Sequence, residues 1–223
     1  MYPVTSYMAN LWDADTSNKN KYENILKENL EILYKIGWNK ERGWVNVKFN
    51  DTWEVCITEN NNEPCFTVTP GHNFQLASLF LRTKDWTFLS EESKTKYQVL
   101  GNEILSKTLA NPNLNNIGNG FYSEFNPITN AVLDKRKTWW QHAEAILALS
   151  FADEKYSKEL NELEKFYFKN FQDITNGGEY FYVTENNEPI VTELKGSIGK
   201  SIYHTIEMIR FRNINKSKSN ENK

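Results

Sequence analysis

The spacing of apolar residues is the feature of this sequence that most restricts its fold. Between Tyr22 and Ile36, apolar side chains recur every three or four positions among lysines and glutamates, as expected for a helix with one buried face. The same spacing predicts six more helices, which gives an all-α fold. The seven predicted helices cover residues 6–13, 22–36, 73–81, 91–109, 138–151, 157–171 and 202–211.

Three glycine-led segments separate these helices. Each alternates large apolar or aromatic side chains with polar ones and ends in Asn, Asp or Pro, which is typical of a short β-hairpin. The three segments cover residues 43–53, 118–130 and 177–189. Helix pairs therefore alternate with hairpins, which amounts to a loose internal repeat.

The predicted helices are of two kinds. Those at 22–36 and 157–171 are charged on one side, which is typical of an outer layer, whereas those at 73–81 and 139–151 carry little charge and are typical of an inner layer. A helix pair cannot bury its apolar faces alone, so neighbouring pairs must stack. The stacked pairs form either an open solenoid or a closed ring of two layers.

Charge and hydropathy argue against nucleic acid and membrane partners. The formal net charge of -3 gives no field that would attract a polyanion. No run approaches eighteen apolar residues, and residues 1–15 lack the basic start and apolar core of a secretory signal, so we expect a cytoplasmic protein. Residues 213–223 are almost entirely polar and are expected to form a disordered tail.

Two cysteines, Cys56 and Cys65, flank a polar run that could bring them together across a turn. A disulfide is geometrically possible, but without a secretion signal the reduced state is favoured. A zinc site with His72 as third ligand lacks the ligand spacing of zinc motifs, so we expect no metal site.

All three histidines lie on the predicted inner helices or where those helices begin, at His72, His142 and His204. In a ring of inner helices that run the same way, such positions meet at one mouth of the barrel. The positive end of a helix dipole disfavours imidazolium and keeps a neutral base available. Two such histidines across a cleft can remove a proton from one face of a carbon and return one to the other. The alternative is that each histidine only caps or packs its helix.

Three further residues stand near His142. Glu144 lies on a mostly apolar helix, where a buried carboxylate needs a partner. Trp139 and Trp140, taken alone, are more typical of a core than of a ligand platform.

Four short motifs, in this order, resemble those of the family of N-acylglucosamine 2-epimerases, cellobiose 2-epimerases and mannose isomerases. They are PGHNFQ from Pro70, KTWWQHAEA from Lys137, GGEYF from Gly177 and YH at Tyr203. The resemblance implies an (α/α)6 barrel, a toroid of six helical hairpins. Residues 1–212 would form its C-terminal portion.

The resemblance also implies a chemistry. His72 and His204 would be the general acid/base pair that moves the C2 proton of an opened mono- or disaccharide through a cis-enediol(ate). Reprotonation at C2 gives an epimer, and reprotonation at C1 gives a ketose. No metal or redox cofactor would be needed. The substrate-binding residues would be Gln75, Trp139, Trp140, His142, Glu144 and Tyr203.

Departures from the family pattern leave alternatives open. Gln75 stands where the family motif has glutamate, and Glu207 where the motif after His204 has arginine. Family members are also about twice as long, so a missing N-terminal half or a second copy of the chain would have to complete the ring. The alternative function is a degenerate module that binds a saccharide or a partner. A glycoside-processing barrel with Glu124 and Glu144 is less favoured, because neither carboxylate pairs at a helix start.

Overall fold

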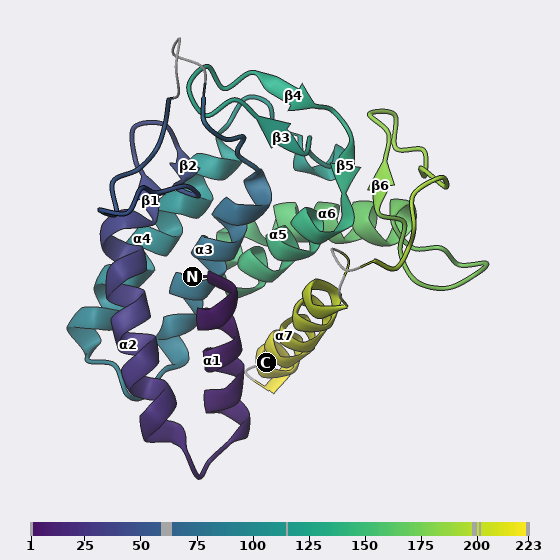
Figure 1. Ribbon diagram of the computed structural model, residues 1–223. Coiled ribbons are helices and arrows are strands. Elements are labelled where there is room, and N and C mark those ends of the chain that lie inside the picture. Colours follow the sequence, from purple (N-terminus) through teal and green to yellow (C-terminus); the bar gives the residue numbers. More distant parts are fainter. Residues whose placement is uncertain (1, 59–63, 115, 198–199, 201, 222–223) are drawn as a thin grey trace.

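The computed structural model describes residues 2–58, 64–114, 116–197, 200 and 202–221, with only the backbone described at 215–221. This part of the chain contains seven α-helices and a few short strands (Figure 1), which confirms the predicted all-α class. The helices are α1 (Tyr2–Ala14), α2 (Lys19–Ile36), α3 (Pro70–Arg82), α4 (Glu91–Leu109), α5 (Trp139–Phe151), α6 (Ser157–Asn170) and α7 (Tyr203–Glu221). The strands are β1 (Trp38–Asn39), β2 (Trp44–Val45), β3 (Glu124–Phe125), β4 (Val132–Asp134), β5 (Lys137–Thr138) and β6 (Tyr182–Val183).

Burial separates the helices into the two predicted layers. In α3, His72 is the one side chain that is not buried, and in α5 the exceptions are Trp140 and Ser150. The helices α2 and α6 bury a single stripe each and present charge to solvent. The inner helices α3 and α5 therefore form the core, and their least buried residues are candidates for a site.

The inner layer follows the order α1, α3, α5 and α7, with α3 packed against α5 and α5 packed against α7. The helices α2, α4 and α6 pack outside α1, α3 and α5 respectively (Figure 1). This alternation of inner and outer helices is the arrangement expected of helical hairpins in a barrel.

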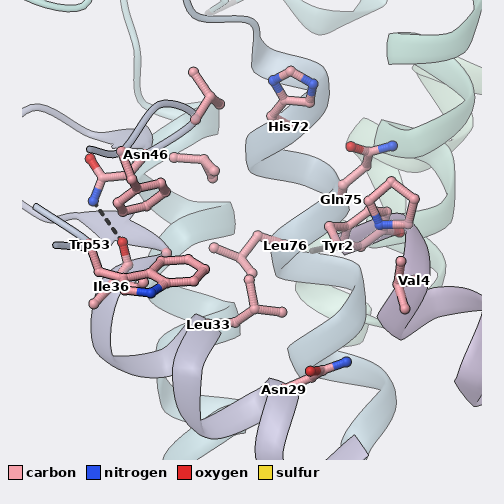
Figure 2. A pocket seen from close by; sticks show the side chains of 15 residues that line it. Tyr2, Val4, Asn29, Leu33, Ile36, Asn46, Trp53, His72, Gln75 and Leu76 are labelled. Carbon is pink, nitrogen blue, oxygen red and sulfur yellow. Dashed lines mark hydrogen bonds between the residues drawn. The ribbon is translucent and has the colours of Figure 1, made fainter. Parts of the chain in front are cut away.

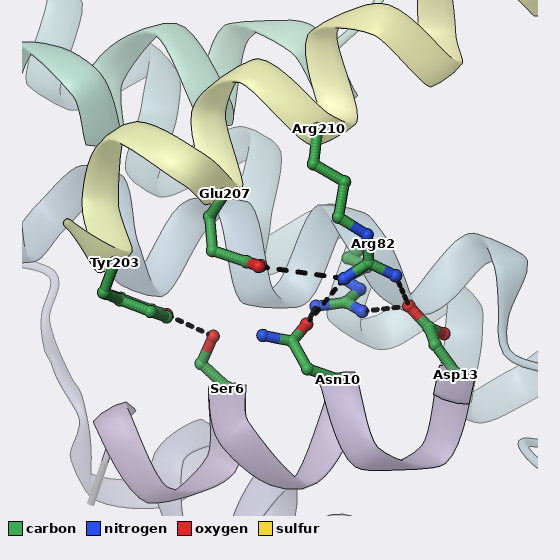
Figure 3. Close-up of polar contacts among 7 residues, drawn as sticks. All are labelled: Ser6, Asn10, Asp13, Arg82, Tyr203, Glu207 and Arg210. Carbon is green, nitrogen blue, oxygen red and sulfur yellow. Dashed lines mark hydrogen bonds and ion pairs between the residues drawn. The ribbon is translucent and has the colours of Figure 1, made fainter. Parts of the chain in front are cut away.

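A polar network joins α1 to α3 and α7 (Figure 3). Asp13 accepts hydrogen bonds from Arg82 at 2.6 Å and from Arg210 at 2.9 Å. Asn10 accepts one from each of the same two guanidinium groups, and Glu207 lies 3.7 Å from Arg210. Two arginines that share one carboxylate and one amide hold the first and last inner helices against the middle of the layer.

Some strands pair with other segments than the sequence predicted. The pairs β1–β2 and β3–β4 are local antiparallel hairpins, but Gly43 lies in the turn that precedes β2 rather than at the start of its hairpin. The segment 177–189 does contain a local antiparallel turn, with Val183 opposite Pro189, but β6 also pairs with β5, which directly precedes α5. Alternation of side chains identifies a strand but does not say which strand it pairs with.

The ends of two helices also differ from the prediction. α1 begins at Tyr2, and α7 continues to Glu221, although the sequence predicted helices starting at 6 and ending at 211. Backbone hydrogen bonds can extend a helix into a polar segment that has no apolar face to bury. The first part of the predicted tail is thus helical, and disorder of residues 213–223 stays a prediction.

Within the described ranges, no helix is long and apolar enough to span a membrane. Cys56 and Cys65 are both free, and the Cys65 thiol donates to the carbonyl oxygen of Cys56 at 2.8 Å.

Candidate active site

His72 lies in the first turn of α3, which the local sequence defines closely. Thr69 is the N-cap, and its hydroxyl oxygen accepts a hydrogen bond from the backbone N–H of His72 at 3.4 Å. Pro70 occupies the first helical position, where its missing N–H costs nothing. Burial, and then the nearby His204, lower the pKa of His72 to about 4. The Nδ1 atom of His72 is buried without a hydrogen-bond partner among the described residues.

Gly71 lets the start of α5 approach the start of α3. A Cβ atom at this position would lie 2.6 Å from the ring of Trp140 and 2.7 Å from the side chain of Gln141. The backbone N–H of Gly71 donates instead to the side-chain oxygen of Gln141 at 3.1 Å. The glycine of the PGH motif therefore places the Trp140 indole directly beside His72.

Glu144 connects three of the inner helices, α3, α5 and α7. Its side chain is fully buried, and its Oε1 atom lies 2.5 Å from Nδ1 of His204. The Nε2 atom of Gln75 donates to the same oxygen at 3.3 Å. Oε2 of Glu144 has no hydrogen-bond partner among the described residues. The buried carboxylate thus finds its partner in His204, and the short contact fixes the orientation of that imidazole.

The Trp140 indole lies close to both candidate imidazoles. Its ring centroid lies 5.5 Å from that of His72 and 5.4 Å from that of His204. The two imidazoles are therefore no further apart than the sum of these distances. The structure therefore brings the two imidazoles near each other and near one indole ring.

Hydroxyl groups cover the side of this site that faces α1. The hydroxyls of Ser6 and Tyr203 lie 2.5 Å apart, and the rings of Tyr7 and Tyr203 are 5.2 Å apart. Burial and the charge of Glu144 raise the pKa of both Tyr2 and Tyr203 above the usual value. Both phenols are therefore neutral hydrogen-bonding groups at physiological pH.

A cavity of about 610 Å³ opens beside His72 (Figure 2). His72, Gln75 and Leu76 line it from α3, and Tyr2 and Val4 line it from α1. The rest of its wall is mostly apolar, from α2 and the segment after β2. This volume is within the range typical of small-molecule sites. His204 is not among the described residues that line it.

The structure places His142 in the core of the protein. Its imidazole is fully buried, accepts a hydrogen bond from the backbone N–H of Phe121 at 3.1 Å and lies 2.7 Å from the carbonyl oxygen of Thr138. Both ring nitrogens are occupied, which defines a neutral tautomer with the proton on Nδ1. Burial lowers the pKa of His142 to about 3. The ring is therefore closed to a sugar in this structure.

Trp139 is likewise a core residue, 1% exposed, with its ring 4.8 Å from Phe181 and 6.0 Å from His204. Of the two tryptophans predicted to stack on a sugar, the structure leaves only Trp140 partly accessible.

Two residues of the site were not predicted. Gln141 bridges the start of α3 to the carbonyl oxygen of Ser123, and Tyr2 lines the cavity. A buried amide on an apolar helix is the same signal that drew attention to Glu144, so Gln141 was open to prediction. The role of Tyr2 could not be predicted from the sequence, because its position depends on how α1 packs. No group of His, Cys, Asp or Glu among the described residues is arranged to hold a metal ion.

A known protein family accounts for most of this sequence. A sequence profile of the N-acylglucosamine 2-epimerase (GlcNAc 2-epimerase) family covers residues 5–208. The chain therefore belongs to the N-acylglucosamine 2-epimerase family. No curated protein sequence matches the chain significantly.

Three solved structures share the fold. A sugar epimerase from a ruminal bacterium is 20% identical with a TM-score of 0.76, over 97% of this chain and 52% of that one. The cellobiose 2-epimerase of Spirochaeta thermophila DSM 6192 is 15% identical with a TM-score of 0.74, over 97% of this chain and 51% of that one. A D-mannose isomerase is 20% identical with a TM-score of 0.72, over 94% of this chain and 55% of that one. The chain has a fold of the (α/α)6-barrel type but spans about half the length of these proteins.

Proposed function

We propose that this chain forms the acid/base site of a sugar 2-epimerase or isomerase, in which His72 and His204 move the C2 proton of an opened aldose. The observation that carries the proposal is the Glu144–His204 pair with its buried carboxylate, because His204 and His72 both lie next to Trp140. A buried carboxylate bonded to an imidazole is a general acid/base arrangement, and a second imidazole lies nearby. The match to the epimerase family, with an epimerase and an isomerase among the similar structures, supports the same reaction class.

Each residue has a role in the proposed reaction. An imidazole removes the C2 proton while the C1 carbonyl oxygen gains a proton, which gives a cis-enediol. Glu144 orients the imidazole of His204 through its Nδ1 atom. The partly exposed Trp140 offers a face for a sugar ring, and the neutral hydroxyl of Tyr203 offers a hydrogen bond. Gln75 lines the cavity and supports Glu144.

The second candidate function is a module that binds a saccharide without turning it over. Two observations favour it: the amide of Gln75 in place of a carboxylate, and the indole of Trp140, whose ring centroid lies within 5.5 Å of both imidazole centroids. A binding module would hold sugar and leave the C2 proton in place.

The proposal is tested in deuterated water with D-mannose and with cellobiose, because similar structures include a D-mannose isomerase and a cellobiose 2-epimerase. The purified protein should replace the C2 proton of one of these aldoses with deuterium, as seen by loss of the H2 signal in the NMR spectrum. Binding of both sugars with no exchange at C2 would favour the binding module.

We further propose that helices outside this chain, from an N-terminal half or from a second copy, cover the outer edges of α1 and α7. Val4, Tyr7 and Leu11 are 41–54% exposed along one stripe of α1. Ile206 and Ile209 are 49% and 41% exposed on α7. Apolar stripes of this kind on neighbouring helices are typical of an interface.

Residues 1–223 expressed alone should therefore self-associate and bind a hydrophobic dye. Sedimentation velocity measures the first property and dye fluorescence the second. Replacing Tyr7 and Ile206 with serine should reduce both, whereas the same change at the isolated, 88% exposed Ile174 should not. A monodisperse monomer that melts cooperatively and binds no dye would contradict this part of the proposal.

A further inference from the structure

The two imidazoles of the proposed pair have unequal surroundings. Nδ1 of His204 lies 2.5 Å from a Glu144 carboxylate oxygen, whereas Nδ1 of His72 is buried with no hydrogen-bond partner among the described residues. The residue one helical turn from His72 is Gln75, whose uncharged amide is turned toward Glu144. A carboxylate therefore supports one imidazole and not the other.

Epimerisation at C2 needs both imidazoles to carry a proton in turn. One imidazole removes the C2 proton from one face, and the other, already protonated, delivers a proton to the opposite face of C2. The reverse reaction exchanges these roles. In either direction, the reaction passes through a state in which His72 is protonated and His204 is neutral.

Isomerisation to a ketose needs only one of them. The same imidazole removes the proton from C2 and returns it to C1 on the same face of the enediol. The C1 oxygen gains a proton as the enediol forms, and the C2 hydroxyl loses one as the ketose forms. The net change moves one hydrogen from C2 to C1 and one from O2 to O1, with no oxidant or reductant.

We propose that this site is built for aldose–ketose isomerisation, with His204 and its Glu144 partner as the group that carries the proton, and is poorly suited to 2-epimerisation. This inference rests on the proposed function. Gln75 is then a specificity-determining residue. A glutamate at this position could support His72 with a carboxylate, whereas the glutamine offers only an amide.

The size of the effect follows from the surroundings of His72. Its neighbours with titratable groups are His204 on α7 and, around the same site, Glu144 on α5 and the neutral phenols of Tyr2 and Tyr203. Burial and His204 both disfavour the imidazolium of His72 and lower its pKa to about 4. At pH 7 roughly one His72 side chain in 10³ then carries a proton. The C2 epimer should form at least about 10²-fold more slowly than the ketose.

The product ratio tests this inference directly. The purified protein is incubated with D-mannose and with cellobiose, and the initial rates of ketose and C2-epimer formation are measured by ¹³C NMR before the ketose re-enters the reaction. The wild-type chain should form the ketose at least about 10²-fold faster than the C2 epimer. An epimer that appears as fast as the ketose would overturn the inference.

Gln75→Glu should shift the ratio toward the epimer by at least about tenfold. The new carboxylate would lie beside Glu144, and repulsion between the two should turn it to the unpaired Nδ1 of His72. Gln75→Met has a similar length without a charge and should leave the ratio near that of the wild type. A shift in Gln75→Met as large as in Gln75→Glu would contradict the role of the carboxylate.

A second readout does not depend on turnover. The imidazole nitrogens of the three histidines can be followed by long-range ¹H–¹⁵N NMR from pH 8 to pH 5. His72 should stay neutral throughout this range in the wild-type chain and should titrate at higher pH in Gln75→Glu. Titration of wild-type His72 near pH 7 would overturn the inference. If neither ketose nor epimer forms, the proposed function fails and the inference fails with it, whatever the titration shows.

Discussion

His204→Asn should lower kcat for the aldose by at least about 10²-fold, because one general acid/base contributes on this scale. Asparagine can still donate a hydrogen bond to Glu144, so the buried carboxylate keeps a partner while the proton-carrying group is lost. KM should change much less than kcat, since the proton transfer contributes to the transition state and not to sugar binding. Steady-state kinetics with NMR detection of products separates the two parameters.

The control for this variant is Val99→Ala on the exposed face of α4, where Val99 is 63% exposed and remote from the site. It should have wild-type kinetics. The far-ultraviolet circular dichroism of His204→Asn should match that of the wild type. A variant that keeps kcat and loses only affinity would show that His204 binds the sugar without carrying its proton.

Acid should destabilise the protein through His72 and His142. The pKa values of His72 and His142 are lowered to about 4 and about 3, mainly by burial, whereas both groups have a pKa near 6.5 in an unfolded chain. Below pH 6.5 the unfolded chain takes up these protons and the folded chain does not. The stability present above pH 6.5 is therefore lost as the pH falls toward 4, by about 1.4 kcal/mol per pH unit for each histidine.

Urea unfolding at pH 7.5, 6 and 5 measures this loss. A protein of ordinary stability, about 5–15 kcal/mol, should be close to unfolding near pH 4. His72→Asn is the matched control, because it removes one of the two histidines and should roughly halve the slope between pH 6 and 5. A free energy of unfolding that stays constant from pH 7.5 to 5 would contradict the neutral, buried state of these side chains.

The sequence predicted the helices and their layers because both depend on local spacing of apolar residues. The charge on one side of 22–36 and 157–171 was enough to place α2 and α6 outside, and the apolar run after Trp139 was enough to place α5 inside. The partner of β6 was not predictable in this way, because strand pairing is decided by tertiary contacts that leave no mark on alternation.

The sequence predicted residues for the candidate site but not the connections among them. His72, Glu144 and His204 were identified from motifs, and the structure brings them to one place. The pairing of Glu144 with His204 rather than with the nearer-in-sequence His142 follows from the packing of α5 against α7. His142 turned out to be held by backbone groups inside the core, since its i−4 carbonyl and the Phe121 N–H satisfy both nitrogens.

The most direct test of the account is the rate at which the C2 proton of an aldose exchanges with deuterated water. The wild-type chain, assembled with the helices that complete its ring, should exchange the C2 proton of D-mannose or cellobiose. The double variant His72→Asn/His204→Asn should not exchange it, although isothermal titration should still detect sugar binding. Exchange that survives in the double variant, or wild-type protein that binds both sugars without exchanging C2, would contradict proton transfer by this pair.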